Sequence, residues 1–349
     1  MSKNFKIGKK KIGYKYKTFI VAEISGNHGG KIKNAIKLIK KAKEAGADAV
    51  KLQTYTPDTI TLNCNKKDFR ISEKSPWKKF KNFWNLYNYA HTPFEWHKKL
   101  FNYAKKINIE IFSSPFDEHA VDLLEKLGCP AYKIASPEIN HIPLLERVAA
   151  TKKPVILSTG LASIKEIYDA LKILKKKNDK IIILKCCSSY PAKFEELNLL
   201  TIQDIKKRFN VLSGLSDHSS GIEAPLVAVA LGANMVEKHF KLNVESVDSF
   251  FSLNRNEFKK MVEKIRICEK ALGKVSYKLS KESKLSLVGK RSIYASSNIK
   301  AGEKINKTNV KVVRPSYGLH PSFYKRILGK VSKRNINFGS RIYLSDLKK

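Results

Sequence analysis

Two stretches decide the fold: Val211-Leu-Ser-Gly-Leu-Ser-Asp-His218 and Asn234-Met-Val-Glu-Lys-His-Phe240. Each begins as a short apolar run and then reaches polar residues that include a histidine. Short apolar runs of this kind are typical of strands buried on both faces of a parallel sheet. Because barrel enzymes gather their chemistry at the carboxyl ends of parallel strands, an apolar run with a polar end indicates a barrel.

The same order recurs along most of the chain. The sequence predicts eight strands, at Phe19–Ile24, Ala49–Leu52, Ile109–Ser113, Ala131–Ala135, Pro154–Ser158, Ile181–Lys185, Val211–Leu215 and Asn234–Lys238. Helical patterns lie between them, among them Asn34–Gly46, Ala120–Gly128 and Ile164–Lys177. Eight strands that alternate with helices predict an α/β fold, a (β/α)8 TIM barrel. A doubly wound sheet is the alternative, and the polar residues at nearly every strand end favour the barrel.

Two segments depart from this alternation. The connection between Tyr55 and Ile109 is too long for one strand-to-helix loop, and this aromatic-rich insert is expected to be either a lid over the active site or part of a subunit interface. After Leu272 the pattern changes, which predicts a barrel domain over residues 1–272, a linker over 273–290 and a small β-rich domain over 291–349. In the small domain, Arg291–Gly302 predicts strand, turn and strand, and Ile336–Leu347 has the same character.

The composition limits the classes of function. The 349 residues include 68 Lys+Arg and 31 Asp+Glu, a formal net charge of +37. This charge raises nucleic-acid binding as a candidate, but the lysines run along the whole chain, so we interpret them as solvated helix faces and expect no nucleic-acid partner. No apolar run is long enough to span a membrane and no signal core follows the basic amino terminus, so we expect a cytoplasmic protein with no membrane partner. The five cysteines lack a C-x-x-C pair and are expected to be free thiols.

Two histidines are candidate metal ligands. His218 and His239 end the last two predicted strands, and adjacent strands lie about 5 Å apart. Both imidazoles can therefore reach one divalent cation, with water or a substrate oxygen completing its shell. The alternative is that one of them is a hydrogen-bonded core histidine.

Two lysines and a set of serines occupy the other strand ends. Lys51 and Lys133 stand among apolar residues, where a lysine is rarely buried without a partner. Either they pair with carboxylates or they bind an anion, and the serines that recur at the same level can donate hydrogen bonds to phosphate or carboxylate oxygens. Phosphoenolpyruvate is one small molecule with both groups. Glu23 and Glu138 are candidate proton-transfer groups, with pairing to a lysine as the alternative.

The strand ends also carry a family resemblance. Ala22-Glu-Ile-Ser-Gly-Asn-His28, Lys51-Leu-Gln-Thr-Tyr-Thr56, Tyr132-Lys-Ile-Ala-Ser136, Gly214-Leu-Ser-Asp-His218 and Glu237-Lys-His-Phe240 resemble, in the same order, motifs of the sialic acid synthases. Residues 51–61 and His91-Thr-Pro-Phe-Glu-Trp-His97 look most like the pseudaminic acid branch of that family. Arg291-Ser-Ile-Tyr294 and Val313-Arg-Pro315 are similar to the antifreeze-like (SAF) domain that these enzymes carry.

The resemblance implies a transferase reaction. Carbon 3 of phosphoenolpyruvate attacks the aldehyde of an open-chain amino sugar, which a divalent metal polarises; manganese is the metal implied, with magnesium or cobalt as alternatives. Water adds to carbon 2, and phosphate leaves with C–O cleavage. The sugar implied is 2,4-diacetamido-2,4,6-trideoxy-β-L-altropyranose, giving pseudaminic acid. N-acetylmannosamine or the sugar that gives legionaminic acid is the nearest alternative, and a non-catalytic sugar-binding barrel is a further one.

The resemblance also implies roles for individual residues. His218 and His239 match metal ligands, and Glu23 matches a proton-transfer group. The positions that match phosphoenolpyruvate-binding residues are Lys51, Ser114, Lys133, Ser136, Ser158, Ser188 and Ser216. Gln53, Tyr190 and Asp248 match positions on the sugar side. Arg314 matches an arginine that reaches from the small domain into the partner's active site, which implies a domain-swapped homodimer.

Overall fold

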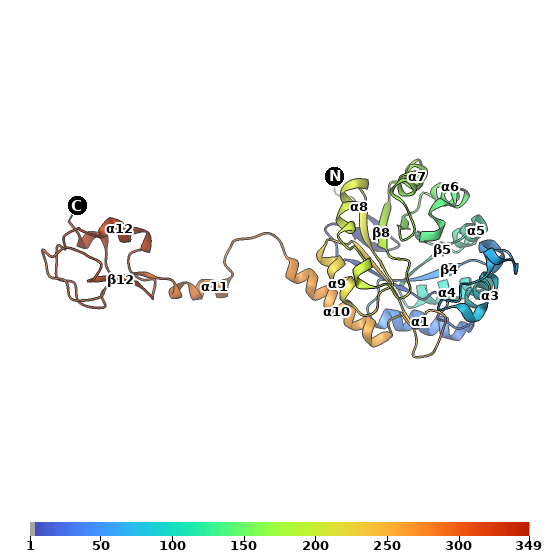
Figure 1. The fold of residues 1–349 in the computed structure, drawn as a ribbon, viewed down its shortest axis with the longest axis horizontal. Coiled ribbons are helices and arrows are strands. Elements are labelled where there is room, and N and C mark those ends of the chain that lie inside the picture. Colours follow the sequence, from blue (N-terminus) through green and yellow to red (C-terminus); the bar gives the residue numbers. More distant parts are fainter. Residues whose placement is uncertain (1–3, 349) are drawn as a thin grey trace. The chain divides into compact units, whose positions relative to one another are not determined.

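The computed structural model describes residues 4–348. The chain divides after Gly273 into two compact units. The first unit is a closed barrel of eight parallel strands in the order β10-β3-β4-β5-β6-β7-β8-β9 (Figure 1). The strands are β3 (Phe19–Glu23), β4 (Ala49–Thr54), β5 (Glu110–Pro115), β6 (Tyr132–Ile134), β7 (Val155–Ser158), β8 (Ile181–Cys186), β9 (Leu212–Asp217) and β10 (Met235–His239). The prediction of a TIM barrel is confirmed, and the strand ends differ from the prediction by one or two residues.

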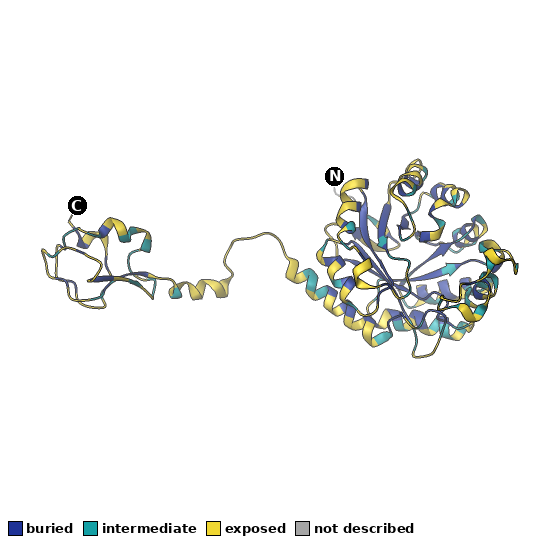
Figure 2. Ribbon diagram, in the orientation of Figure 1, coloured by how far each residue is buried: buried dark blue, intermediate teal, exposed yellow. Residues whose placement is uncertain are grey.

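Eight helices alternate with these strands and lie around the barrel (Figure 1). They are α1 (Ile32–Glu44), α4 (Phe94–Lys106), α5 (Glu118–Lys126), α6 (Ile142–Ala150), α7 (Ile164–Lys175), α8 (Thr201–Phe209), α9 (Glu223–Ala230) and α10 (Arg255–Leu272). Single-turn 3-10 helices occur at Ser136–Asn140 and Phe194–Glu196. The strands are buried and the outer helix faces are exposed (Figure 2), so the lysine-rich faces are solvated as the sequence indicates.

Strand pairing sets the level of the polar residues. Where β10 closes the barrel on β3, His239 pairs with Glu23, and Glu23 pairs with Lys51 of β4. On the other side of β10, Glu237 pairs with Ser216 of β9. The predicted site residues of these four strands therefore share one end of the barrel because the register places them there.

The amino terminus forms a hairpin that the sequence pattern did not indicate. Strands β1 (Asn4–Ile7) and β2 (Lys10–Gly13) pair antiparallel, and Ile7 and Ile12 are completely buried. The backbone N–H of Lys9 donates to the Glu110 carboxylate at the first residue of β5, at 2.8 Å. The hairpin therefore covers the amino-terminal end of the barrel, away from the polar strand ends.

The insert after β4 folds into α2 (Pro57–Ile60), two 3-10 turns (Lys67–Phe69 and Lys78–Phe80) and α3 (Phe83–Ala90). Its own small core joins Ile71 and Leu86 to Val247 of the loop that follows β10. The insert is thus anchored over the carboxyl end of the barrel, next to the strand ends that carry the polar residues.

The second unit has a separate apolar core that includes Ile293, Ile305, Ile327 and Ile342. Its elements are α11 (Lys281–Leu285), a 3-10 turn (Ser286–Gly289), β11 (Ser292–Ala295), β12 (Val310–Val313), a 3-10 turn (Pro321–Phe323), α12 (Tyr324–Ile327) and a 3-10 turn (Leu344–Asp346). Strands β11 and β12 pair antiparallel.

Two predictions for this unit are wrong. Only the first strand predicted within Arg291–Gly302 forms, and it pairs with β12. The second predicted strand is absent, because Ile299 makes only a single isolated bridge before the turn at Gly302. Within Ile336–Leu347 the backbone also makes only isolated bridges, and Gly339 with φ +77° interrupts it. The segment expected to be a linker contains the short helix α11. No helix within residues 4–348 is long and apolar enough to cross a membrane.

Candidate active site

A cavity of about 510 Å³ lies among the carboxyl ends of the barrel strands. Most of the residues predicted from the sequence line it: Lys51, Gln53, Lys133, Ser136, Ser158, Tyr190, Ser216, His218, His239 and Asp248. They come from β4, β6, β7, β9 and β10 or from the segments that follow β6, β8, β9 and β10. The recurrence of polar strand ends therefore located a real cavity.

Four predicted residues do not line the cavity. Glu23 is fully buried directly behind it, and Ser114 is buried and accepts a hydrogen bond from Lys51 Nζ at 3.2 Å. Ser188 packs against Gly160: a Cβ added to Gly160 would stand only 2.2 Å from the Ser188 hydroxyl oxygen. Arg314 is exposed and follows β12 in the second unit.

Two lysines and one carboxylate, Lys51, Lys133 and Glu237, form the floor of the cavity, and Glu23 pairs with Lys51 behind it. Lys51 Nζ lies 2.5 Å from a Glu23 carboxylate oxygen and 3.6 Å from Glu237 Oε1. Lys133 Nζ lies 3.5 Å from the same Glu237 oxygen, which also accepts a hydrogen bond from Ser216 at 3.2 Å. All four charged side chains are at most 4% exposed. The predicted pairing of the lysines with carboxylates is confirmed, and both lysines also line the cavity. Their binding of an anion stays a prediction.

Burial and pairing act in opposite directions on this cluster. Burial alone would lower the pKa of Lys51, but Glu23 and Glu237 outweigh it and raise that pKa. Lys133 has weaker pairing, and burial lowers its pKa. Burial raises the pKa of Glu23 despite Lys51, whereas Lys133 and Lys51 outweigh burial and lower the pKa of Glu237. Lys133 is therefore the lysine whose charge is least satisfied by the protein alone.

The two histidines face each other, with ring centroids 5.2 Å apart. His218 Nδ1 lies 2.8 Å from the carbonyl oxygen of Cys187. A carbonyl can only accept, so Nδ1 carries a proton. Contact with Cys186 outweighs burial and raises the pKa of His218, so Nε2 can bind a cation once it has lost its proton. Burial lowers the pKa of His239 well below its ordinary value, so His239 is neutral and also has a lone pair to share.

These donors fit a divalent cation. His239 Nδ1 is buried and has no hydrogen-bond partner among residues 4–348, and the nearest carboxylate oxygen, Asp248 Oδ2, is 3.8 Å away. An orphaned buried nitrogen is costly unless something else binds it. No group of three or more His, Cys, Asp or Glu side chains suited to a metal occurs in that range. Two imidazoles would leave the remaining positions to water and substrate oxygens, as in open catalytic sites.

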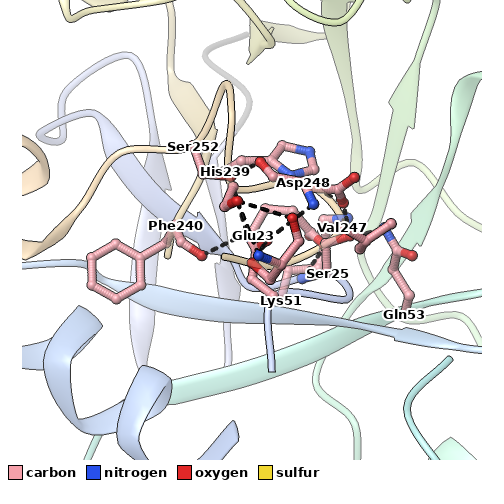
Figure 3. A network of polar contacts seen from close by, with 12 residues as sticks. Glu23, Ser25, Lys51, Gln53, His239, Phe240, Val247, Asp248 and Ser252 are labelled. Carbon is pink, nitrogen blue, oxygen red and sulfur yellow. Dashed lines mark hydrogen bonds and ion pairs between the residues drawn. The ribbon is translucent and has the colours of Figure 1, made fainter. Parts of the chain in front are cut away.

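Asp248 is presented by the loop after β10 and lies near Ser25 and His239 (Figure 3). Asn27 holds this loop in place. The Asn27 side-chain amide donates to Phe240 O and to the Ser252 hydroxyl, both at 3.0 Å. Its oxygen accepts from the Asp248 backbone N–H at 3.2 Å. The Ser25 hydroxyl donates to the Asp248 carboxylate. Asp248 is therefore held beside His239.

Glu138 is a second acidic group that lines the cavity. Burial raises the pKa of Glu138 to about 7, and Lys133 and Lys51 only partly oppose that effect. Its Oε2 atom is buried and has no hydrogen-bond partner among the described residues. A carboxyl that is half-protonated near neutral pH can both accept and return a proton.

The sequence reasoning missed Glu237 and Cys186 as site residues. Both line the cavity, and Glu237 is the centre of the charged floor. The signal for Glu237 was present: side chains two apart on a strand point the same way, so a His239 that faces the cavity brings Glu237 with it. Cys186 Sγ lies 3.8 Å from His218 Nδ1, and this contact lowers the pKa of Cys186 to about 7, although burial alone would raise it.

The chain is similar to proteins of a known family. Residues 38–277 match the NeuB family, and residues 290–348 match the SAF domain. The chain belongs to the NeuB family. Other proteins similar to it are the pseudaminic acid synthase of Campylobacter jejuni strain 81-176, 48% identical over 95% of this chain and 97% of that protein, and the pseudaminic acid synthase of Helicobacter pylori, 43% identical over 95% and 98%.

Solved structures agree with this assignment. The N-acetylneuraminic acid synthetase of Leptospira borgpetersenii serovar Hardjo-bovis, in complex with citrate, is 34% identical. The match has a TM-score of 0.73 and covers 82% of this chain and 96% of that one. The resemblance to sialic acid synthases with a SAF domain, stated from the motifs, is therefore confirmed for this NeuB-family chain.

Proposed function

We propose that this NeuB-family enzyme is a pseudaminic acid synthase. It would condense phosphoenolpyruvate with 2,4-diacetamido-2,4,6-trideoxy-β-L-altropyranose and water, and release pseudaminic acid and phosphate. The observation that carries the proposal is the 48% identity to a pseudaminic acid synthase over 95% of the chain, together with a cavity that joins two buried lysines to two histidines.

The proposed reaction forms one C–C bond and breaks one C–O bond. Carbon 3 of phosphoenolpyruvate forms a C–C bond to the aldehyde carbon of the open-chain sugar, whose oxygen takes up a proton. Water adds to carbon 2 and gives up one proton, which balances the proton taken up by the aldehyde oxygen. The C–O bond to phosphate then breaks, and the hydroxyl left on carbon 2 passes its proton to the phosphate and becomes the keto oxygen. When bound to His218 and His239, a divalent metal (we infer manganese) would supply polarisation of the aldehyde.

The floor of the cavity suits phosphoenolpyruvate. Lys51 and Lys133 would neutralise its carboxylate and phosphate, since ammonium groups bind such anions strongly in a buried site. The hydroxyls that we assign to the same ligand are those of Ser136, Ser158 and Ser216, which line the cavity, with Ser114 and Ser188 behind them. Gln53, Tyr190 and Asp248 would face the sugar.

Two carboxyls are candidates for proton transfer. Glu23 follows from the family motif, but its oxygens are engaged by Lys51 at 2.5 Å and by the Ser25 backbone N–H at 2.8 Å. Glu138 faces the cavity and has a pKa of about 7. We therefore assign Glu138 the proton exchanged near the phosphoenolpyruvate, and Glu23 the orientation of Lys51 and any exchange on the sugar side.

We further infer a cytoplasmic, domain-swapped homodimer in which Arg314 reaches the partner's cavity. The support is the family motif at Val313-Arg-Pro315 and the exposure of Arg314. Exposed arginines are free to form bidentate contacts with a ligand's oxygens.

Phosphate release with a panel of sugars tests the function. The purified chain is assayed with phosphoenolpyruvate and, in parallel, the diacetamido altrose sugar, the sugar that gives legionaminic acid, and N-acetylmannosamine. We expect phosphate release with the first sugar only, and loss of release with a chelator. Turnover of N-acetylmannosamine alone would contradict the assignment. Sugar binding without phosphate release would instead favour a non-catalytic barrel.

A further inference from the structure

We propose that an aromatic wall, made of Trp77, Phe83, Tyr87 and Phe116, selects sugars that carry a methyl group rather than a hydroxymethyl group at carbon 6. The proposal rests on the function proposed above, because it concerns the sugar half of the same cavity. It assigns to the insert a specificity role in the reaction.

The cavity has two chemically different halves. Its floor carries the lysines, serines and histidines of the strand ends, whereas the insert contributes Ile60, Trp77, Phe83, Leu86, Tyr87 and Ala90. Phe116, which directly follows β5, continues this apolar side. Trp77, Phe83, Tyr87 and Phe116 are each only half-buried, so aromatic surface remains open toward the cavity.

Ring contacts link three members of the aromatic wall, Phe83, Tyr87 and Phe116, through Tyr55. Tyr55 lies edge-on to Tyr87, with centroids 5.9 Å apart, and edge-on to Phe116 at 5.0 Å. Phe83 stacks on Tyr87 at 6.2 Å. Such pairs are favourable beyond the area they bury, so the wall is preformed rather than assembled by the ligand.

Trp77 ties the aromatic wall to the two-histidine site. Its indole N–H donates to Val247 O at 2.9 Å, so this polar atom is already satisfied and is not offered to a ligand. The Trp77 ring contacts Tyr190 at 5.4 Å, and Tyr190 lies over His218 at 4.4 Å. The wall therefore begins two ring contacts from the histidines.

The direction of the bound sugar follows from the reaction. The aldehyde carbon must meet carbon 3 of phosphoenolpyruvate at the polar floor, so carbons 4 to 6 extend toward the aromatic wall. There a methyl group and the acetamido methyl gain by leaving water, whereas a hydroxymethyl group loses hydrogen bonds that the rings of Trp77, Phe83 and Phe116 do not return. Discrimination by one such group is on the order of 10- to 100-fold.

The test uses two open-chain diacetamido sugars that differ only at carbon 6, one with a methyl and one with a hydroxymethyl group. We expect the wild-type kcat/KM to favour the methyl sugar by about 10-fold or more. Phe83→Ser and Phe116→Ser should each reduce that preference to about 3-fold or less by raising KM for the methyl sugar, while KM for phosphoenolpyruvate stays unchanged.

The matched control is Tyr89→Ala. Tyr89 belongs to the same helix as Phe83 and is 46% exposed, and its ring packs on Phe80 outside the cavity. It should leave the preference unchanged. The two test residues lie on different elements, and unaltered phosphoenolpyruvate binding verifies the fold of each variant. Absence of a methyl preference in the wild type, or the same preference in both variants, would overturn the proposal.

Failure of the proposed function gives a different result. If the chain turns over only N-acetylmannosamine, the function is wrong, and the aromatic wall is then decided with N-acetylmannosamine and its 6-deoxy analogue. A 6-deoxy preference that Phe83→Ser removes would still support the wall in that case. If the enzyme then shows no preference between N-acetylmannosamine and its 6-deoxy analogue, both the proposed function and the proposed role of the aromatic wall are rejected.

Discussion

Replacing Glu237 by glutamine tests how much its charge contributes to the stability of the buried charge cluster. Glu237 Oε1 lies 3.6 Å from Lys51 Nζ and 3.5 Å from Lys133 Nζ. Glu237→Gln keeps the shape of the side chain and its acceptor for Ser216 but removes the charge. Lys51 retains Glu23 at 2.5 Å, whereas no other carboxylate among the described residues forms an ion pair with Lys133.

The expected loss of stability is about 3 kcal/mol. At an effective dielectric constant of about 20, two unit charges 3.5 Å apart attract by roughly 4–5 kcal/mol, and the amide recovers part of that by accepting from lysine. Breaking a buried pair in other proteins costs about 3–5 kcal/mol. For a barrel of this size, about 3 kcal/mol corresponds to a fall in Tm of roughly 6–12 °C.

Thermal and urea denaturation measure this loss, and a second substitution tests its cause. Because the cost comes from an orphaned ammonium, Glu237→Gln combined with Lys133→Met should recover at least half of it, since both partners are then neutral. Lys133→Met alone is the matched control. A Glu237→Gln protein within about 0.5 kcal/mol of wild type, or a double variant less stable than Glu237→Gln, would refute the reasoning.

Three further outcomes are expected. His239→Ala should lose manganese in equilibrium dialysis and lower kcat by 100-fold or more, while circular dichroism shows that the fold persists. Full retention of the metal by this variant would exclude His239 as a ligand. Glu138→Gln should lower kcat by about 100-fold and abolish the fall in activity below pH 7, because the carboxyl with pKa about 7 must be ionised to accept a proton; an unaltered pH profile would exclude it. Arg314→Ala should raise KM for the sugar at least 10-fold without changing KM for phosphoenolpyruvate, and equal constants would exclude its reach into the cavity.

The barrel and most of its site were predictable because they depend on local pattern. Buried parallel strands are short and apolar on both faces, so Ile181–Cys186 stands out against its polar surroundings. Side chains at strand ends such as Lys51 and His218 then fall at one level, since all eight strands run the same way. Once the barrel is predicted, residues far apart in the sequence can therefore be expected to lie together at one end of it.

What escaped prediction depends on contacts between distant segments. The first strands have only four residues each, and nothing local signals that Ile7 and Ile12 cover the barrel. In the second unit, residues around Ile336 have strand-like composition, yet each pairs through a single bridge. A preference for extended backbone does not establish a ladder, because a ladder needs a partner in register.

The charged floor explains why the site combines lysines with carboxylates when its ligand is an anion. Two buried lysines without counter-ions would cost more than a small gain in ligand binding returns, so the fold supplies Glu23 and Glu237 as internal partners. With those partners ionised, the two lysines and two carboxylates sum to no net charge. A phosphoenolpyruvate that carries about three negative charges therefore arrives in a pocket that cannot neutralise it alone. The imidazoles of His218 and His239, placed beside this floor, provide a position where a cation and its positive charge can be held. Anion affinity and cation affinity in this cavity are thus consequences of the same arrangement, since each ligand supplies the charge that the other lacks.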